Sequence, residues 1–139
     1  MTVWQQVLEV TTHGSGFTDI TARLRSMVRQ SGCQTGLCTV FVQHTSASLL
    51  IQENADPSVL RDLEDWFEEL APKKRHWEHS MEGPDDMSAH ARCAVTRTSE
   101  NIPICQGDLA LGQWQGIYLW EHRQRGHIRH LMVHIMGES

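Results

Sequence analysis

Short apolar segments with few residues between them make up the last third of the chain, and they limit what it can fold into. They lie at 101–105, 109–112, 116–122 and 129–136. Strands joined so closely are expected to pair antiparallel, because a parallel pair needs a long crossover connection. Three earlier segments rich in β-branched or apolar residues are also predicted to be strands, at 3–10, 35–43 and 47–53.

Two to three helices are expected beside these strands, which predicts an α+β fold with antiparallel sheets. The 47–53 strand is expected to pair with 35–43 across a connection that begins at His44. The clearest helix is 57–70, because Asp56 can cap it, a proline follows at the first helical position, and its apolar residues form one stripe. Its acidic residues are predicted to form a solvated face, namely Asp62, Glu64, Asp65, Glu68 and Glu69.

Two shorter helices are predicted on either side of this one. The first, capped by Thr18 or Asp19, is expected to end at Gly32, and the other to span about 86–95. Residues 71–86 form a long irregular connection before it. Connections of this length within small domains are usually functional or mobile, and we favour a functional role.

Length and charge exclude several classes of protein. The 139 residues fit one compact domain, 1–139, with its own core, and the formal net charge of −5 argues against a general nucleic-acid binder. Four cysteines without a CxxC pair are most simply reduced thiols in a cytosolic protein. The chain shows neither an export signal nor an apolar run long enough for a membrane span, so we expect a cytoplasmic protein without a membrane partner.

The stretch "QHTSASLLIQEN", 43–54, places polar groups in what otherwise resembles a buried strand. On an extended backbone His44, Ser46 and Ser48 project from the same face, so an imidazole and two hydroxyls could line one wall. The alternative is a strand end whose hydroxyls satisfy backbone groups. A serine hydrolase is the weaker interpretation, because there is no G-x-S-x-G turn.

A second polar stretch, "EHSMEGPDDMSAH", combines histidines with carboxylates. If Asp85 caps the following helix, Asp86 and His90 lie four residues apart on one face of it. A carboxylate there can orient an imidazole, or both groups can ligate one cation, and His79 lies in the same stretch. The alternative is an acidic cap beside an exposed histidine.

The segment after residue 107 offers further polar candidates around an aromatic strand. Gln115 and Glu121 lie at either end of this strand. Three arginines follow at Arg123, Arg125 and Arg129, and guanidinium groups match phosphate oxygens. A solvated hairpin turn is the competing interpretation.

Taken together, these segments resemble the YjbQ family, small proteins described as secondary thiamine-phosphate synthases. The resemblance covers nearly the whole chain, through "QHTSASLLIQENADPSV", "EHSMEGPDDMSAH", "TSENIPICQGDLALGQWQGIYLWEHR" and the closing "GE". It departs from the family pattern at Gln113 and Arg97. The matching residues are His44, Thr45, Ser46, Glu53, Asn54, Asp56, His79, Asp85, Asp86, His90, Trp114, Gln115 and Glu121.

The resemblance implies a homotrimer with a polar cavity near a subunit boundary. It also implies a reaction in which a pyrimidine diphosphate is joined to a thiazole phosphate and diphosphate is released. On this hypothesis His44, His79 and His90 hold a divalent metal, Mg or Zn, or a phosphate group of the substrate. The expected catalytic residues are His44, Ser46, Asp86, Gln115 and Glu121, and the expected outer anion contacts are Arg123, Arg125 and Arg129.

Two other functions remain open on the same residues. One is metal-assisted hydrolysis of a phosphorylated or otherwise activated small molecule, with a bound water as nucleophile. The other is a trimeric protein that binds a metabolite or a metal without catalysis.

Overall fold

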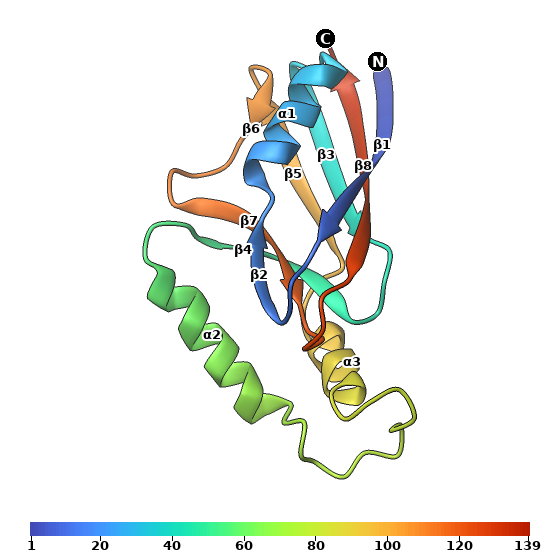
Figure 1. The fold of residues 1–139 in the computed structure, drawn as a ribbon. Coiled ribbons are helices and arrows are strands. Elements are labelled where there is room, and N and C mark those ends of the chain that lie inside the picture. The colour runs from blue at the N-terminus through green and yellow to red at the C-terminus, as the bar shows by residue number, and fades with distance from the viewer.

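A computed structural model describes residues 1–139 as three helices and eight strands (Figure 1). Every strand pair is antiparallel, so the α+β class with antiparallel sheets is confirmed. In chain order the elements are β1 (Thr2–Thr11), β2 (Gly16–Asp19), α1 (Thr21–Ser31), β3 (Thr35–Val42), β4 (Ala47–Glu53), α2 (Pro57–Leu70), α3 (Asp86–Ala94), β5 (Ser99–Cys105), β6 (Asp108–Leu109), β7 (Gln115–Glu121) and β8 (Ile128–Glu138).

The larger sheet has the strand order β1-β8-β3-β5-β6, and α1 covers one of its faces (Figure 1). Successive residues of a strand point to opposite faces, so buried and exposed side chains alternate along most of β8. The buried face and α1 form the core, which includes Leu24, Val40 and Val133. The opposite face exposes apolar side chains, namely Val3, Val7, Leu37, Phe41 and Met136.

The smaller sheet has the order β2-β7-β4, and it shows that the predicted pairing of 47–53 with 35–43 is wrong. β3 has β8 on one side and β5 on the other, so it offers no free edge to β4. β4 pairs with β7 instead, with Ala47 opposite Glu121 and Ser48 opposite Trp120. Residues 43–46 therefore carry the chain from one sheet to the other.

The start of α1 also differs from the prediction. Residues 16–19 form the short strand β2 against β7, and the N-cap of α1 is Ile20 without a side-chain cap. Asp19 still satisfies the helix end, because its carboxylate accepts a hydrogen bond of 2.9 Å from the backbone N–H of Thr21. Gly32 ends the helix in the left-handed conformation, as predicted.

Helix α2 stands apart from the sheets and is attached mainly through one part of its surface (Figure 1). Phe67 is its one buried residue and packs on Trp120 with 4.4 Å between ring centroids, whereas Trp66 is 56% exposed. The predicted solvated acidic face is confirmed at Asp62, Asp65, Glu68 and Glu69, which are exposed, whereas Glu64 is partly buried. Glu64 accepts a hydrogen bond from the Trp120 indole, and Glu68 lies 3.0 Å from the guanidinium of the buried Arg92.

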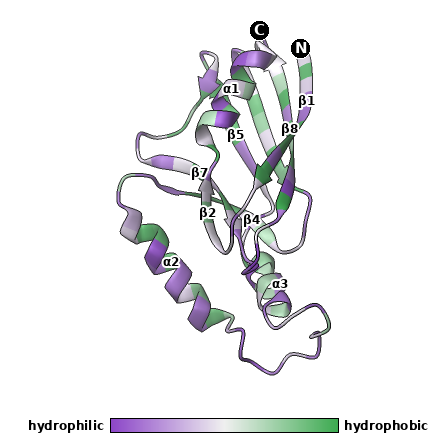
Figure 2. Ribbon diagram, viewed as in Figure 1, coloured by the Kyte–Doolittle hydropathy of each residue, from purple (hydrophilic) through white to green (hydrophobic).

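Polar and apolar residues are mixed along α1 and α2, as Figure 2 shows. None of the helices has the length and apolar character needed to cross a bilayer.

Candidate functional site

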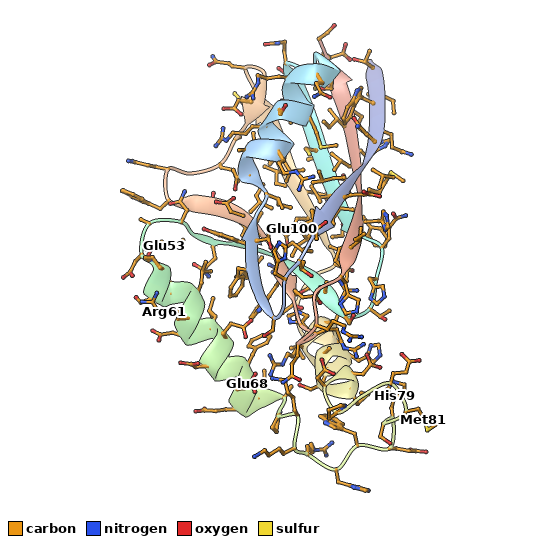
Figure 3. The ribbon with its side chains drawn as sticks, in the orientation of Figure 1. Glu53, Arg61, Glu68, His79, Met81 and Glu100 are labelled. Atoms are coloured by element: carbon orange, nitrogen blue, oxygen red, sulfur yellow. The ribbon has the colours of Figure 1, made fainter.

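The irregular connection after α2 brings His79 to the start of α3, where it meets Asp86 and His90. Figure 3 shows His79 on this connection beside α3. The Nε2 atoms of His79 and His90 lie 2.7 Å and 3.1 Å from the same carboxylate oxygen of Asp86, Oδ2. Asp86 and His90 are four residues apart on α3, as the sequence predicted. We call His79, Asp86 and His90 the His79 cluster.

Arg123 holds the carboxylate of Asp86 from its other side. Its Nη1 donates to Asp86 Oδ1 at 2.8 Å, and its Nε donates to Asp85 at 3.1 Å. Burial by itself raises the pKa of Asp86, but the hydrogen bond from His79 and the charges of His90 and Arg123 outweigh burial. The pKa of this carboxyl is therefore below its usual value, which keeps Asp86 ionised.

The donor set of the His79 cluster suits a divalent transition metal. Its two imidazole nitrogens and one carboxylate oxygen lie within 4.8 Å of one another. The Nδ1 of His90 lies 3.0 Å from the carbonyl oxygen of Thr45, so a proton on Nδ1 leaves Nε2 free to bind a cation. Nitrogen-rich sites of this kind favour Zn²⁺ over Mg²⁺, which prefers oxygen ligands.

A second group of polar residues surrounds Glu121 at the end of β7. Glu121 and Arg129 are both buried, and the guanidinium donates to both carboxylate oxygens of Glu121. The Thr12 hydroxyl also donates a hydrogen bond to Glu121, at 2.6 Å. The backbone N–H of Arg123 donates another, at 3.1 Å. Burial raises the pKa of Glu121, but the hydrogen bonds from Arg129 and Thr12 outweigh it, so the pKa lies below its usual value.

His44 belongs to this second group and is not a member of the His79 cluster, although the sequence placed it with His79 and His90. The backbone N–H of Ser46 donates to His44 Nδ1 at 3.1 Å. Nδ1 is therefore unprotonated, and the neutral ring carries its proton on Nε2. Burial and the charge of Arg129 lower the pKa of His44, which favours the neutral ring.

Ser46 links His44 to the buried ion pair. Arg129 donates to the Ser46 hydroxyl oxygen at 2.9 Å, and that hydroxyl lies 3.0 Å from His44 Nδ1. Ser46 is buried and has no open side toward solvent. We infer that it orients the imidazole, so that the Nε2–H of His44 is the group available to a ligand.

Both groups border the same cavity, which has a volume of about 590 Å³. His44 and His90 line it together with apolar and small side chains from β3 and α3, including Phe41, Cys93 and Ala94. Arg123 also joins the two groups, because its backbone N–H donates to Glu121 while its guanidinium donates to Asp86. The two groups and the cavity between them form one candidate site.

Comparison with known proteins decides the family. Residues 6–138 match the family described as "UPF0047 protein YjbQ-like". The chain belongs to the YjbQ family. A UPF0047 protein of Synechocystis is 55% identical over 96% of this chain and 92% of its own length. YjbQ of Escherichia coli O157:H7 is 36% identical over 97% of this chain and 99% of its own length.

Solved structures of YjbQ-like proteins share the fold. A Sulfolobus solfataricus protein of unknown function superposes with a TM-score of 0.88 at 25% identity, covering 99% of this chain and 100% of that one. A YjbQ-family protein from Clostridium acetobutylicum gives a TM-score of 0.84 at 34% identity, covering 96% and 99% of the two chains. These likenesses establish the family and the fold.

The YjbQ-family motifs do not all meet in one place within this chain. Gln115 begins β7 and Glu121 ends it, which separates them by roughly 20 Å of strand. Gln115 instead accepts a hydrogen bond from the backbone N–H of Gly112 at 2.8 Å. Of the two residues that depart from the family pattern, Gln113 lies near Gln115 at the start of β7. The other, Arg97, is exposed at the surface.

Three other predictions about polar residues need correction. Asp85 does not cap α3 through its side chain, because its carboxylate binds Arg123 and the backbone N–H of Gln124. Arg123 and Arg129, which were predicted to contact an anion, form ion pairs with carboxylates of the protein itself. The third predicted anion contact, Arg125, has an exposed side chain. Ser48 does not share a wall with His44, since residues 43–46 are not extended and Ser48 contacts His122 at 2.8 Å.

Two residues of the site, Thr12 and Cys93, were not predicted from the sequence. Thr12 lies far from Glu121 along the chain, and no local sequence pattern connects the two. Cys93 had a usable signal, because it follows His90 by three residues on α3 and so shares its face.

The buried His122 is expected to make stability depend on pH. Burial, with the charge of Arg92 adding to it, lowers the pKa of His122 from 6.5 to about 3. The unfolded chain then binds a proton more readily than the folded one below about pH 6.5, so stability falls as pH decreases, by up to about 1.4 kcal/mol per unit. Urea unfolding across about pH 6.5 to 4.5 measures this slope.

A matched pair of variants isolates the contribution of His122. His122→Gln removes the titrating group and can still contact Ser48, so we expect a flatter dependence than in the wild type. His130→Gln changes an exposed histidine and should retain the wild-type slope. An unchanged slope in His122→Gln would assign the pH dependence to other groups.

Proposed function

We propose that this YjbQ-family protein is a metal-dependent enzyme that acts on a phosphorylated small molecule. The observation that carries the proposal is the convergence of two imidazoles and one ionised carboxylate beside a cavity of about 590 Å³. The family resemblance supplies the specific reaction. It is the coupling of a hydroxymethylpyrimidine diphosphate to a thiazole phosphate with release of diphosphate, as in thiamine-phosphate synthases.

His79, Asp86 and His90 are the residues that would hold the cation. A bound divalent cation would neutralise the negative charge that develops on the diphosphate leaving group. Arg123 keeps the Asp86 carboxylate in place and ionised, and the Thr45 carbonyl orients the ring of His90. These neighbours support the ligand geometry before any cation binds.

His44 is proposed to donate a hydrogen bond to the substrate. Its Nδ1 is occupied by Ser46, and its Nε2 makes no hydrogen bond within the protein although the residue lines the cavity. A neutral imidazole with its proton on Nε2 can donate to a phosphate or carbonyl oxygen. The buried Glu121 and Arg129 position Ser46 and thereby the ring.

Product analysis tests the reaction. Zinc-loaded protein is incubated with both thiamine precursors, and we expect thiamine phosphate and inorganic diphosphate to form in equal amounts. His44→Ala is expected to lower turnover while zinc remains bound, because His44 lies outside the ligand set. Retention of zinc without any turnover would instead support a binding protein that sequesters a metal or metabolite.

Hydrolysis is the second candidate, and the number of protein ligands favours it. Catalytic zinc sites keep three protein ligands and leave a position for water, and the His79 cluster provides three. In the same incubation, hydrolysis would consume one precursor alone and form no thiamine phosphate. The two reactions are therefore distinguished by their products.

We also propose that the protein is a homotrimer, as the family resemblance implies. Exposed apolar side chains on the open face of the larger sheet support a subunit interface, as does the exposed Trp66 on α2. Gln115 can reach the site around His44 only from a neighbouring copy, because it lies at the far end of β7. Light scattering is expected to give three times the mass of one chain, and a monomer would contradict the proposal.

A further inference from the structure

A second pocket borders the His79 cluster at His79, whereas the cavity that His44 lines borders it at His90. It has a volume of about 360 Å³ and is formed by the connection between α2 and α3. His79 is part of its wall, so the pocket opens beside the candidate cation site. Its other lining residues are Lys73, Lys74, Arg75, His76, Trp77, Ser80, Gly83 and Pro84.

This pocket concentrates positive charge in a protein whose formal net charge is −5. The only two lysines of the chain, Lys73 and Lys74, lie in it with Arg75. The carboxylates of the same connection, Glu78 and Glu82, do not line it. No carboxylate therefore lines the wall of the pocket, and Glu68 contacts only the Lys73 side of it.

Two of these cations have no carboxylate partner. Lys73 pairs with Glu68 at 2.8 Å, but neither Lys74 nor Arg75 forms an ion pair. By contrast, Arg123 and Arg129 are held by carboxylates, so binding a phosphate there would mean breaking an existing ion pair. The free charges beside the His79 cluster are those of Lys74 and Arg75.

Trp77 holds the guanidinium of Arg75 in place. The guanidinium carbon lies 4.5 Å from the centroid of the indole ring, and the indole N–H donates to the carbonyl of Pro72. A guanidinium stacked on an aromatic ring keeps its N–H donors at the edges, where a phosphate oxygen can accept from them. Arg75 is thus partly preorganised for an anion.

We propose that the pocket of residues 73–84 binds the phosphate groups of the substrate whose reacting atom lies at the His79 cluster. The inference rests on the proposed function, and it names the position of the charged end of the substrate. Lys74 and Arg75 are the principal contacts, with His76 and Ser80 as further hydrogen-bond donors. The less polar part of the same molecule then extends past His79 and His90 into the cavity lined by Phe41 and Ala94.

Calorimetric titration of inorganic diphosphate into metal-free full-length protein tests this assignment. Saturable binding by the wild type is expected, and the double variant Lys74→Gln/Arg75→Gln is expected to bind at least about tenfold more weakly. The control is Arg29→Gln/Arg61→Gln, which removes the same charge from exposed positions outside the pocket. It should bind diphosphate within about twofold of the wild type.

The outcomes separate this inference from the proposed function. Absence of saturable binding to the wild type, or an equal loss in the two double variants, would overturn the assignment of the pocket. Zinc titration of the same proteins is an independent measurement, because none of the substituted residues belongs to the His79 cluster. Failure of the wild type to bind zinc would refute the proposed function, whereas diphosphate binding lost only in Lys74→Gln/Arg75→Gln would still support the pocket.

Discussion

Replacing Asp86 with asparagine is expected to lower the affinity of the protein for zinc by at least about 100-fold. The substitution exchanges the anionic member of the His79 cluster for a neutral amide, whose oxygen is a much weaker ligand. It also removes the carboxylate that pairs with Arg123. The guanidinium charge, no longer neutralised by Asp86, then repels a cation bound near the cluster. Competition with a chromogenic chelator measures the affinity.

Asp85→Asn is the matched control for this substitution. It makes the same chemical change one residue away, removes a carboxylate from the same arginine, and leaves His79, Asp86 and His90 intact. We expect its zinc affinity to stay within about tenfold of the wild type. Equal losses in the two variants would mean that general charge near Arg123, and not a ligand at Asp86, determines binding.

Glu121→Gln is expected to lower the free energy of unfolding by about 3–5 kcal/mol. The carboxylate and the guanidinium of Arg129 are both buried, and they are joined by two hydrogen bonds. The neutral amide leaves the guanidinium charge buried without a counter-charge, and it loses one acceptor for Thr12 or Arg129. Urea unfolding near neutral pH measures the change.

A double variant distinguishes the cost of an unpaired charge from the value of the pair itself. Glu121→Leu/Arg129→Met removes both charges and keeps apolar volume, so we expect it to be less destabilised than Glu121→Gln. The double variant should nevertheless bind substrate poorly, because Ser46 and His44 lose the guanidinium that positions them. A cost below about 1 kcal/mol for Glu121→Gln would mean that the pair is hydrated in solution.

Local sequence patterns predicted most of the individual elements. Helix α2 follows from Asp56, Pro57 and its apolar spacing, and its bounds match the prediction. The relation between Asp86 and His90 also follows from sequence, because four residues on a helix place two side chains on one face. In each case the interacting residues are near in the chain, so propensity and periodicity are sufficient.

Pairings between distant residues did not follow from such patterns. The short distance between β3 and β4 along the chain suggested a hairpin, yet both edges of β3 are taken by strands from the C-terminal half. Competition for strand edges is a property of the whole sheet, and adjacent segments carry no signal of it. For the same reason the acidic residues of α2 gave no indication that Glu68 meets the buried Arg92.

The sequence by itself determined the fold class, most of the helix positions, the family and the proximity of Asp86 to His90. Only the tertiary structure decided which charges are already paired: Arg123 and Arg129 with carboxylates, Lys74 and Arg75 with none. It also separated His44 from the His79 cluster and Gln115 from Glu121. The physical reason is that a residue type specifies what a side chain can bind, whereas its actual partner depends on which distant segments the folded chain brings within a few ångströms.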